Sequence, residues 1–283
     1  MRGAGGEPVD FARTVRSHGC ADLPPASIAP DGSWYRTVLR LGGACRAVTL
    51  TSAKGEIHVA VDGTLSASER KELSANIRRM FRLDEDFAPF YESIAGDPDL
   101  GWAVNGAGRM MASPTVFEDV VKTICTTNCA WSGTVRMIGA LVANLGTGAF
   151  PTPQEMAAAP ESFYRDVARA GYRGAYLRQL ASEVAGARLD LEVLRPRCGL
   201  SDDEVEMRLL ALPGVGPYAC AHIMMLLGRY HRLILDSWTR PKYLTVSGRK
   251  RAADASIQRA FRRYGAFAGL AFWLRLTEDW VPG

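Results

Sequence analysis

The segment LLALPGVGPYACAHIMMLLGRYHRLILDSWTR, residues 209–240, contains two predicted helices joined by a tight turn with two glycines. Gly214 and Gly216 allow the turn to adopt positive φ and another molecule to approach the backbone closely. The helix that starts at Pro217 presents unpaired N–H groups and the positive end of its dipole. Such a terminus can bind a phosphate without a basic side chain. An ordinary turn between two helices is the simpler alternative.

Asp236 is the acid nearest to this turn in the downstream sequence. It lies 20 residues after Gly216 and directly follows the apolar residues Ile234 and Leu235. An acid at the end of an apolar run is expected beside a cleft. The commonest role of Asp at a helix boundary is that of an N-cap. The two roles are compatible, so Asp236 is a candidate catalytic residue and a candidate cap.

The remainder of the chain has a β-rich start and a helical body. Alternating apolar residues predict antiparallel strands at 34–41, 47–50 and 56–61, followed by a helix at 67–81. Capping boxes at Thr115, Thr152 and Ser201 predict helices that start there, the first of them running to about residue 145 and the last to 212. Later helices are predicted at 217–228, 252–263 and 266–276.

These elements predict an α+β fold that is mainly helical and begins with an antiparallel sheet. The expected division is a sheet domain with one helix at 1–112, a helical domain at 113–240 and C-terminal helices at 241–283. The helical domain contains the hairpin of helices at 201–228 and Asp236. The C-terminal helices are expected to pack back against the helical domain.

Composition narrows the class of protein. The chain has 283 residues, of which 47% are hydrophobic, and a net charge of +4, so a disordered protein is excluded. The apolar runs are shorter than the roughly 18 residues of a membrane span, and the N-terminus has no hydrophobic signal segment. Six scattered cysteines without a CxxC pair predict free thiols and a cytosolic protein.

Basic residues are concentrated near the C-terminus. Residues 240–263 contain eight basic residues and one acid, a net charge of +7, which leaves −3 for the rest of the chain. A local basic patch on a nearly neutral protein predicts a polyanionic partner. A solvated helix face is the alternative that charge alone leaves open.

Several ordered blocks resemble one family. The pairing of LPGVGPY with LDSWTR resembles the helix-hairpin-helix–GPD superfamily of DNA base-excision glycosylases. The blocks RMFRLD (79–84), FY (90–91), FE (117–118), ICTTN (124–128) and GYRGAY (171–176) resemble its 8-oxoguanine branch in order and approximate spacing. FAGLAFW (267–273) and TEDW (277–280) are more similar to the 3-methyladenine glycosylase branch. Together these blocks cover roughly residues 70 to 280.

The resemblance implies roles for individual residues. Asp236 matches the catalytic aspartate, and Asn128 and Tyr172 match residues that enter the duplex where a base has left. Arg173 is then a candidate reader of the orphaned partner base. The phosphate-binding turn comprises Leu212, Pro213, Gly214, Val215 and Gly216, and the carbonyls of Leu210, Leu212 and Val215 are expected to hold a Na⁺ or K⁺ ion. The partner implied is double-stranded DNA with a damaged base, bound by a monomer, with Arg240 and Lys242 of the basic segment on backbone phosphates.

Two departures from the family pattern bear on the reaction and on cofactors. Bifunctional relatives carry a lysine at the position of Tyr218, and a phenol cannot form a Schiff base, so we expect a monofunctional enzyme. Lys122 and Lys242 are the nearest alternative amines. Because Cys220 is the last cysteine, the four-cysteine iron–sulfur loop of one branch is absent, and no cofactor is expected to be required. Cys125 and Cys129 lie one helical turn apart and could in principle chelate a metal. Because no His or further Cys is near them in the sequence, they are predicted to be small core residues.

The pocket for the base departs from the family as well. The Gly-Gln-Phe-Arg-Trp stretch of 8-oxoguanine enzymes has no match, and the N-terminus has His18-Gly19-Cys20 and Leu23-Pro24-Pro25 instead. The candidate pocket residues are Tyr218, His222, Phe272 and Trp273. Aromatic walls would stack an extruded base, most strongly a cationic alkylated purine. Ordinary core packing is the alternative for Phe272 and Trp273, as is a satisfied interior histidine for His222.

The sequence therefore predicts a monofunctional DNA glycosylase of base-excision repair that removes an alkylated purine or oxidised guanine and leaves an abasic site. The alternatives are a non-catalytic damaged-DNA-binding protein of the same fold, a glycosylase with weak AP-lyase activity, and a helical scaffold that uses the hairpin as a turn. A carboxylate beside phosphates repels them, which argues against a pure binding protein.

Overall fold

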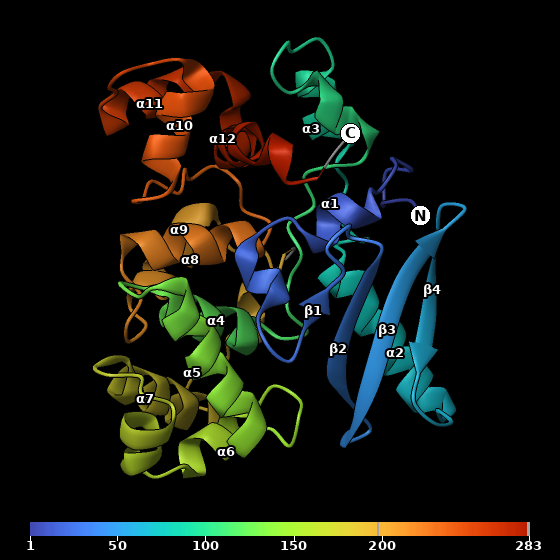
Figure 1. Ribbon diagram of the computed structural model, residues 1–283, viewed down its shortest axis with the longest axis vertical. Helices are drawn as coiled ribbons and strands as arrows, with labels where there is room; N and C mark the ends of the chain where they lie inside the picture. The colour runs from blue at the N-terminus through green and yellow to red at the C-terminus, as the bar shows by residue number, and fades with distance from the viewer. Residues whose placement is uncertain (197, 282–283) are drawn as a thin grey trace.

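A computed structural model describes residues 1–196 and 198–281. Figure 1 shows a sheet on one side of the molecule and helices on the other, with the C-terminal helices above the central ones. Buried apolar side chains form three clusters, one in each of these regions.

The N-terminal region is a four-stranded antiparallel sheet with a helix against it. The strands are adjacent in chain order: β1 (Ser27–Ile28), β2 (Trp34–Leu41), β3 (Ala44–Ala53) and β4 (Glu56–Val61). Side chains alternate along β2, where Tyr35, Leu39 and Leu41 are buried, and α2 (Ala67–Met80) packs Leu73 and Met80 into the same core. The predicted sheet and helix are confirmed, although β3 is longer than predicted. The short elements α1 (Phe11–Val15) and η1 (Gly19–Asp22) precede the sheet.

The central region is helical and contains most of the predicted capping residues. Its elements are α4 (Val116–Thr126), α5 (Trp131–Asn144), α6 (Pro153–Ala158), the π-helix η3 (Phe163–Val167), α7 (Arg173–Ala185), η4 (Glu192–Leu194), α8 (Asp202–Leu210) and α9 (Pro217–Leu226). The capping boxes at Thr152 and Ser201 are both formed. At Thr115 only half is present, because the side chain of Glu118 pairs with Lys122 at 2.8 Å.

The prediction of one continuous helix from 115 to 145 is wrong. The chain leaves the helix at Thr127, which is extended, and Asn128 takes a left-handed conformation with φ 44°. Thr126 and Thr127 donate their hydroxyls to the carbonyls of Thr123 and Ile124, which offers the backbone an alternative to further helix. Asn is among the few residues that tolerate left-handed φ. The break leaves Asn128 exposed between α4 and α5.

The third region brings together two distant parts of the chain. The elements α3 (Ala88–Ile94) and η2 (Gly101–Asn105) share a core with α10 (Thr239–Ser247), α11 (Asp254–Phe261), η5 (Arg262–Phe267), α12 (Ala268–Thr277) and η6 (Glu278–Trp280). Residues 87–110, which we expected in the sheet domain, thus contribute to the core of the C-terminal helices. Figure 1 shows α3 beside α12.

Helix α9 joins the central and C-terminal regions. All residues from Ala219 to Leu226 are buried, so the helix is apolar around its whole circumference. Ile223 and Met224 pack into the central core, whereas Ala221 and Met225 pack into the C-terminal one. This packing fixes the N-terminus of α9, where the glycine turn lies. No helix in the described part of the chain is long and apolar enough to cross a membrane.

Candidate active site

The turn between α8 and α9 is held in one conformation by its first glycine. Gly214 has φ 80°, and a Cβ there would lie 2.8 Å from Cδ2 of Tyr176. The N–H of Val215 donates to the carbonyl of Leu212 at 3.2 Å and closes the turn. Gly216 has φ −97°, and a Cβ there would meet nothing within 4 Å. Gly214 therefore supplies the positive φ that the turn needs. The open space at Gly216 leaves the first N–H groups of α9 accessible.

Asp236 stands in the loop that enters α10. Its Oδ1 accepts hydrogen bonds from the N–H groups of Trp238 at 2.8 Å and Thr239 at 2.7 Å. The hydroxyl of Thr239 in turn accepts the N–H of Asp236 at 2.8 Å. The same oxygen thus performs the predicted capping role, and Oδ2 stays available to a molecule in the cleft.

Asn128, in the turn after α4, and Tyr172, just before α7, project together. Nδ2 of Asn128 donates to the hydroxyl of Tyr172 at 3.3 Å, and this hydrogen bond lowers the pKa of the phenol. Tyr172 is 54% exposed and stands at 6.0 Å, edge to face, from Tyr176. A polar amide and an exposed aromatic ring therefore form one protruding pair.

The structure assigns Arg173 a different role from the expected one. Its side chain is buried. Nη2 of the guanidinium donates to the carbonyls of Thr127 and Asn128, and Nη1 donates to the carbonyl of Ala170. Nε adds a bond to the Thr127 carbonyl at 3.0 Å. A guanidinium held in this way cannot read a partner base, which corrects the expectation. Arg173 instead holds the turn that presents Asn128.

The hairpin, Asp236 and the Asn128–Tyr172 pair meet in one cleft of about 660 Å³. Its walls are residues 126–129, Tyr172 and Tyr176, the turn and start of α9 at 214–219, and residues 235–237. An acid, a helix N-terminus and a protruding amide–aromatic pair thus face one space, although they come from four separate segments of the chain.

Comparison with solved structures shows which known fold this chain has. A 3-methyladenine DNA glycosylase from Archaeoglobus fulgidus aligns over 99% of this chain and 98% of its own, with a TM-score of 0.74 at 19% identity. An 8-oxoguanine glycosylase/lyase from Clostridium acetobutylicum, in complex with double-stranded DNA containing cytosine opposite 8-oxoguanine, aligns over 97% and 93% with a TM-score of 0.73 at 18% identity. This chain has the DNA glycosylase fold. No protein-family model matches the sequence, and no curated protein matches it.

A smaller glycosylase matches only part of the chain. The 3-methyladenine DNA glycosylase of fission yeast, in complex with abasic DNA, aligns over 73% of this chain and 96% of its own, with a TM-score of 0.51 at 16% identity. The two fuller matches extend over nearly the whole chain and therefore include its N-terminal sheet. The α+β fold that the predicted elements indicate is confirmed.

Within this glycosylase fold the four predicted pocket residues are placed differently. Tyr218 lines the cleft, and burial raises the pKa of its phenol. His222 is buried one turn further along α9, at 6.1 Å between ring centroids from Tyr218. Trp273 is 6% exposed, lies 6.3 Å from His222, and donates its indole N–H to the Ser17 carbonyl at 2.7 Å.

The expectation that Phe272 lines the pocket is wrong. Its ring is fully buried between Phe261, at 5.2 Å, and Tyr243, at 6.1 Å, in the core of the C-terminal helices. Consecutive residues of α12 point to different sides, so only Trp273 faces the α9 side. Core packing, the alternative considered for Phe272, is what the structure shows.

The predicted phosphate contacts Arg240 and Lys242 are engaged within the protein. Arg240 forms a bidentate pair with Asp254 at 2.8 Å, and Lys242 pairs with Asp279 at 2.6 Å. Both pairs are partly exposed, so each contributes little to stability and can be exchanged for another anion. The basic segment is thereby partly neutralised in the structure.

The two alternative lysine nucleophiles lie away from the cleft. Lys122 is buried and pairs with Glu118 at 2.8 Å on the same helix. Lys242 is held by Asp279. No lysine is among the described residues that line the cleft, whereas Tyr218 is one of them.

The sequence reasoning missed an aromatic group beside Asp236. Trp238 is 40% exposed, and its ring lies 5.6 Å from the rings of both Trp273 and Trp280. Its position two residues after the acid was a usable signal. Tyr176 was also overlooked as a site residue, although its spacing of four from Tyr172 predicts that both share one face of a helix.

Proposed function

We propose that this protein is a monofunctional DNA glycosylase that extrudes a damaged base and hydrolyses its N-glycosidic bond. The observation that carries the proposal is the convergence of Asp236, the N-terminus of α9 and the Asn128–Tyr172 pair on one cleft. The fold supports it, since the fully aligned structures are glycosylases for 3-methyladenine and 8-oxoguanine, one of them bound to double-stranded DNA.

Extrusion is the first step, because a base stacked in a duplex cannot be reached. Flipping costs a few kcal/mol and costs least for a damaged or mispaired base. Tyr172 and Asn128 would enter the vacated space, where the ring replaces stacking and the amide replaces hydrogen bonds. The turn held by Arg173 keeps Asn128 in position before DNA arrives, so little ordering is needed on binding.

Hydrolysis then requires stabilisation of positive charge on the sugar. The carboxylate of Asp236 near C1′ stabilises an oxocarbenium-like transition state, as in glycoside hydrolysis. Oδ1 is held by two backbone N–H groups, which fixes the carboxylate, and Oδ2 can orient the attacking water. The base leaves, water adds to C1′, and an abasic site remains.

Backbone phosphates would be held by the start of α9. The unpaired N–H groups after Gly216 and the helix dipole attract a phosphate. The carbonyl of Leu210 at the end of α8 and those of Leu212 and Val215 in the turn would hold a monovalent cation that links the turn to the phosphate. The Leu212 carbonyl also accepts the N–H of Val215, and its second lone pair is left for the ion. Such contacts position the duplex without reading its sequence.

Replacing Gly214 by Ala is expected to lower DNA affinity about tenfold. The added Cβ clashes with Tyr176, and the alanine would have to adopt a positive φ. The turn therefore loses the shape that presents its N–H groups. Fluorescence anisotropy with a duplex containing an abasic-site analogue measures the effect. Gly139→Ala is the matched control, since a Cβ there meets nothing within 4 Å. Equal affinity for both variants would contradict the proposed role of the turn.

The substrate is proposed to be an alkylated purine or an oxidised guanine. Tyr218 in the cleft and the partly exposed Trp238, two residues after Asp236, would offer aromatic faces on which an extruded base stacks, most strongly when it is cationic. Duplexes carrying single 3-methyladenine-type, 8-oxoguanine, hypoxanthine, ethenoadenine or uracil lesions test this with the purified protein. If the protein excises none of these lesions, the proposal is wrong.

Strand cleavage is expected only after alkali treatment. Lyase activity needs an amine that forms a Schiff base, and Tyr218 stands at the position where relatives carry lysine. Incubation of the protein with borohydride and a duplex containing a lesion that it excises should trap no covalent protein–DNA complex. A trapped complex, or strand breaks at neutral pH without alkali, would show that Lys242 or another amine reaches C1′.

A further inference from the structure

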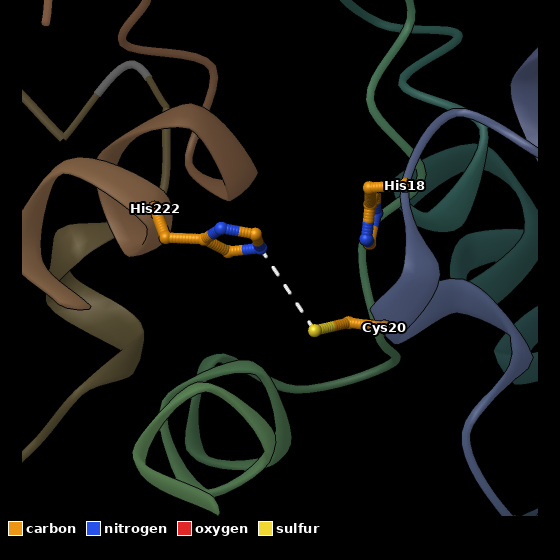
Figure 2. A group of neighbouring side chains, drawn as sticks. All are labelled: His18, Cys20 and His222. Carbon is orange, nitrogen blue, oxygen red and sulfur yellow. Dashed lines mark hydrogen bonds between the residues drawn. The ribbon is translucent and has the colours of Figure 1, made fainter. Parts of the chain in front are cut away.

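Behind the cleft, three side chains form a buried cluster that the proposed reaction does not use. His18 and Cys20 come from the N-terminal segment and His222 from α9, and Figure 2 shows them pointing toward one another. They are 4%, 5% and 8% exposed. One nitrogen of each ring and the sulfur all lie within 4.8 Å of one another, and Sγ of Cys20 is 3.8 Å from Nε2 of His222.

The hydrogen bonds fix which atom of His18 is free. Its Nε2 lies 2.6 Å from the carbonyl of Met111, so this nitrogen carries the hydrogen and donates it. Nδ1 of the neutral ring then holds a lone pair, and within residues 1–196 and 198–281 this buried atom has no hydrogen-bond partner. Buried polar atoms left unpaired cost about 1–3 kcal/mol each, which calls for an explanation.

We propose that His18, Cys20 and His222 bind a soft divalent transition metal of the zinc class, outside the catalytic cleft. Imidazole nitrogen and thiolate sulfur are the ligands such ions prefer. Ligand atoms around a tetrahedral zinc lie about 3.3–3.6 Å apart, so these three would close by roughly 1 Å through side-chain rotation. The Met111 carbonyl would act as the outer partner that orients the His18 ring, as is common for metal-bound histidines.

The two neutral rings suit metal binding, whereas the thiol has to lose its proton. Burial, with a smaller effect of His222, lowers the pKa of His18 to about 3, and burial lowers that of His222 to about 4, so both rings are neutral. Burial raises the pKa of Cys20 to about 12. Binding therefore breaks the S–H bond of Cys20, forms a sulfur–metal bond and passes one proton to the buffer, with no change of oxidation state. The thiolate leaves a net charge of +1 on the complex.

A metal at this position would join two parts of the chain that otherwise contact each other through the Cys20–His222 hydrogen bond and through packing. His18 and Cys20 precede the sheet, whereas His222 lies on the helix that begins at the phosphate-binding turn. His222 also contacts Tyr218 and Trp273. The ion would thus fix the wall behind the base pocket and stabilise the native chain, independently of the reaction that the cleft performs.

Cobalt provides the test, because Co²⁺ replaces zinc and absorbs light according to its ligands. Full-length protein is reduced, stripped with a chelator and titrated with Co²⁺, then with Zn²⁺. We expect one equivalent of Co²⁺, a thiolate-to-cobalt charge-transfer band, the visible bands of a four-coordinate site, and displacement by Zn²⁺. The melting temperature should rise by several degrees with one equivalent of Zn²⁺.

Variants separate this site from incidental metal binding. Cys20→Ser is expected to abolish the charge-transfer band and weaken binding at least about tenfold, and His18→Gln to weaken it comparably. Cys220→Ser, a buried thiol on α9 outside the cluster, should retain both properties. Uptake of well under one equivalent by the wild type, or loss of the band in Cys220→Ser, overturns the proposal. If Cys20→Ser does not fold, unchanged binding by His18→Gln overturns it as well.

Discussion

Asp236→Asn is expected to lower the rate of base excision by at least about 10³-fold and to leave DNA affinity within about twofold. The amide oxygen of Asn can accept the same hydrogen bonds from Trp238 and Thr239, so the start of α10 keeps its cap. The substitution removes only the negative charge that stabilises the developing oxocarbenium ion. Loss of excision in this variant therefore reports charge and not a change of fold.

Single-turnover excision on the best lesion of the panel, with anisotropy on an abasic-site analogue, measures the two quantities separately. Asp236→Ala serves as a comparison, because it removes charge and cap together and should also lower the melting temperature. Excision by Asp236→Asn close to the wild-type rate would eliminate the proposed mechanism. Loss of affinity in proportion to loss of excision would indicate that Asp236 orders the loop and does not act on the sugar.

Local signals in the sequence were sufficient for much of the fold. The strands at 34–41 and 56–61 have the predicted bounds, because no helical pattern of apolar residues overlaps the alternating one there. The capping boxes at Thr152 and Ser201 located two helix starts correctly, since a cap depends on only four residues. The glycine turn and Asp236 were placed at one cleft by the spacing of their motifs, and the structure brings them together.

Features that depend on tertiary partners were not predictable. Arg173 appeared available to a base, but the carbonyls that bind it belong to a turn 45 residues away in the sequence. Phe272 and Trp273 are equally aromatic, and only the packing of α12 separates the buried ring from the one beside His222. Asp254, which pairs with Arg240, was already counted in the charge of the segment. Asp279 and Asp97, which pair with Lys242 and Arg263, lie outside the segment, so its net charge overstated its free charge.

Arg173→Met is the change with the next largest expected effect, a loss of about 10–100-fold in excision. Methionine keeps most of the buried volume, but the carbonyls of Thr127 and Asn128 lose their donors, at a cost of about 2–4 kcal/mol in stability. Asn128 then lacks the support for its left-handed conformation, and its bond to Tyr172 weakens. Extrusion of the base should therefore become the limiting step.

The dependence on base pairing distinguishes this positioning role from simple destabilisation. A mispaired lesion costs less to extrude, so the defect of Arg173→Met should be smaller when the same lesion stands opposite a mismatched base. Arg178→Met, an exposed arginine on the same helix, should leave excision unchanged on both duplexes. An equal loss on paired and mispaired lesions, measured well below the melting temperature, would reduce Arg173 to a purely structural residue. Recovery on the mispaired duplex alone would place its effect on the Asn128–Tyr172 pair, since only that pair has to fill the space the base leaves.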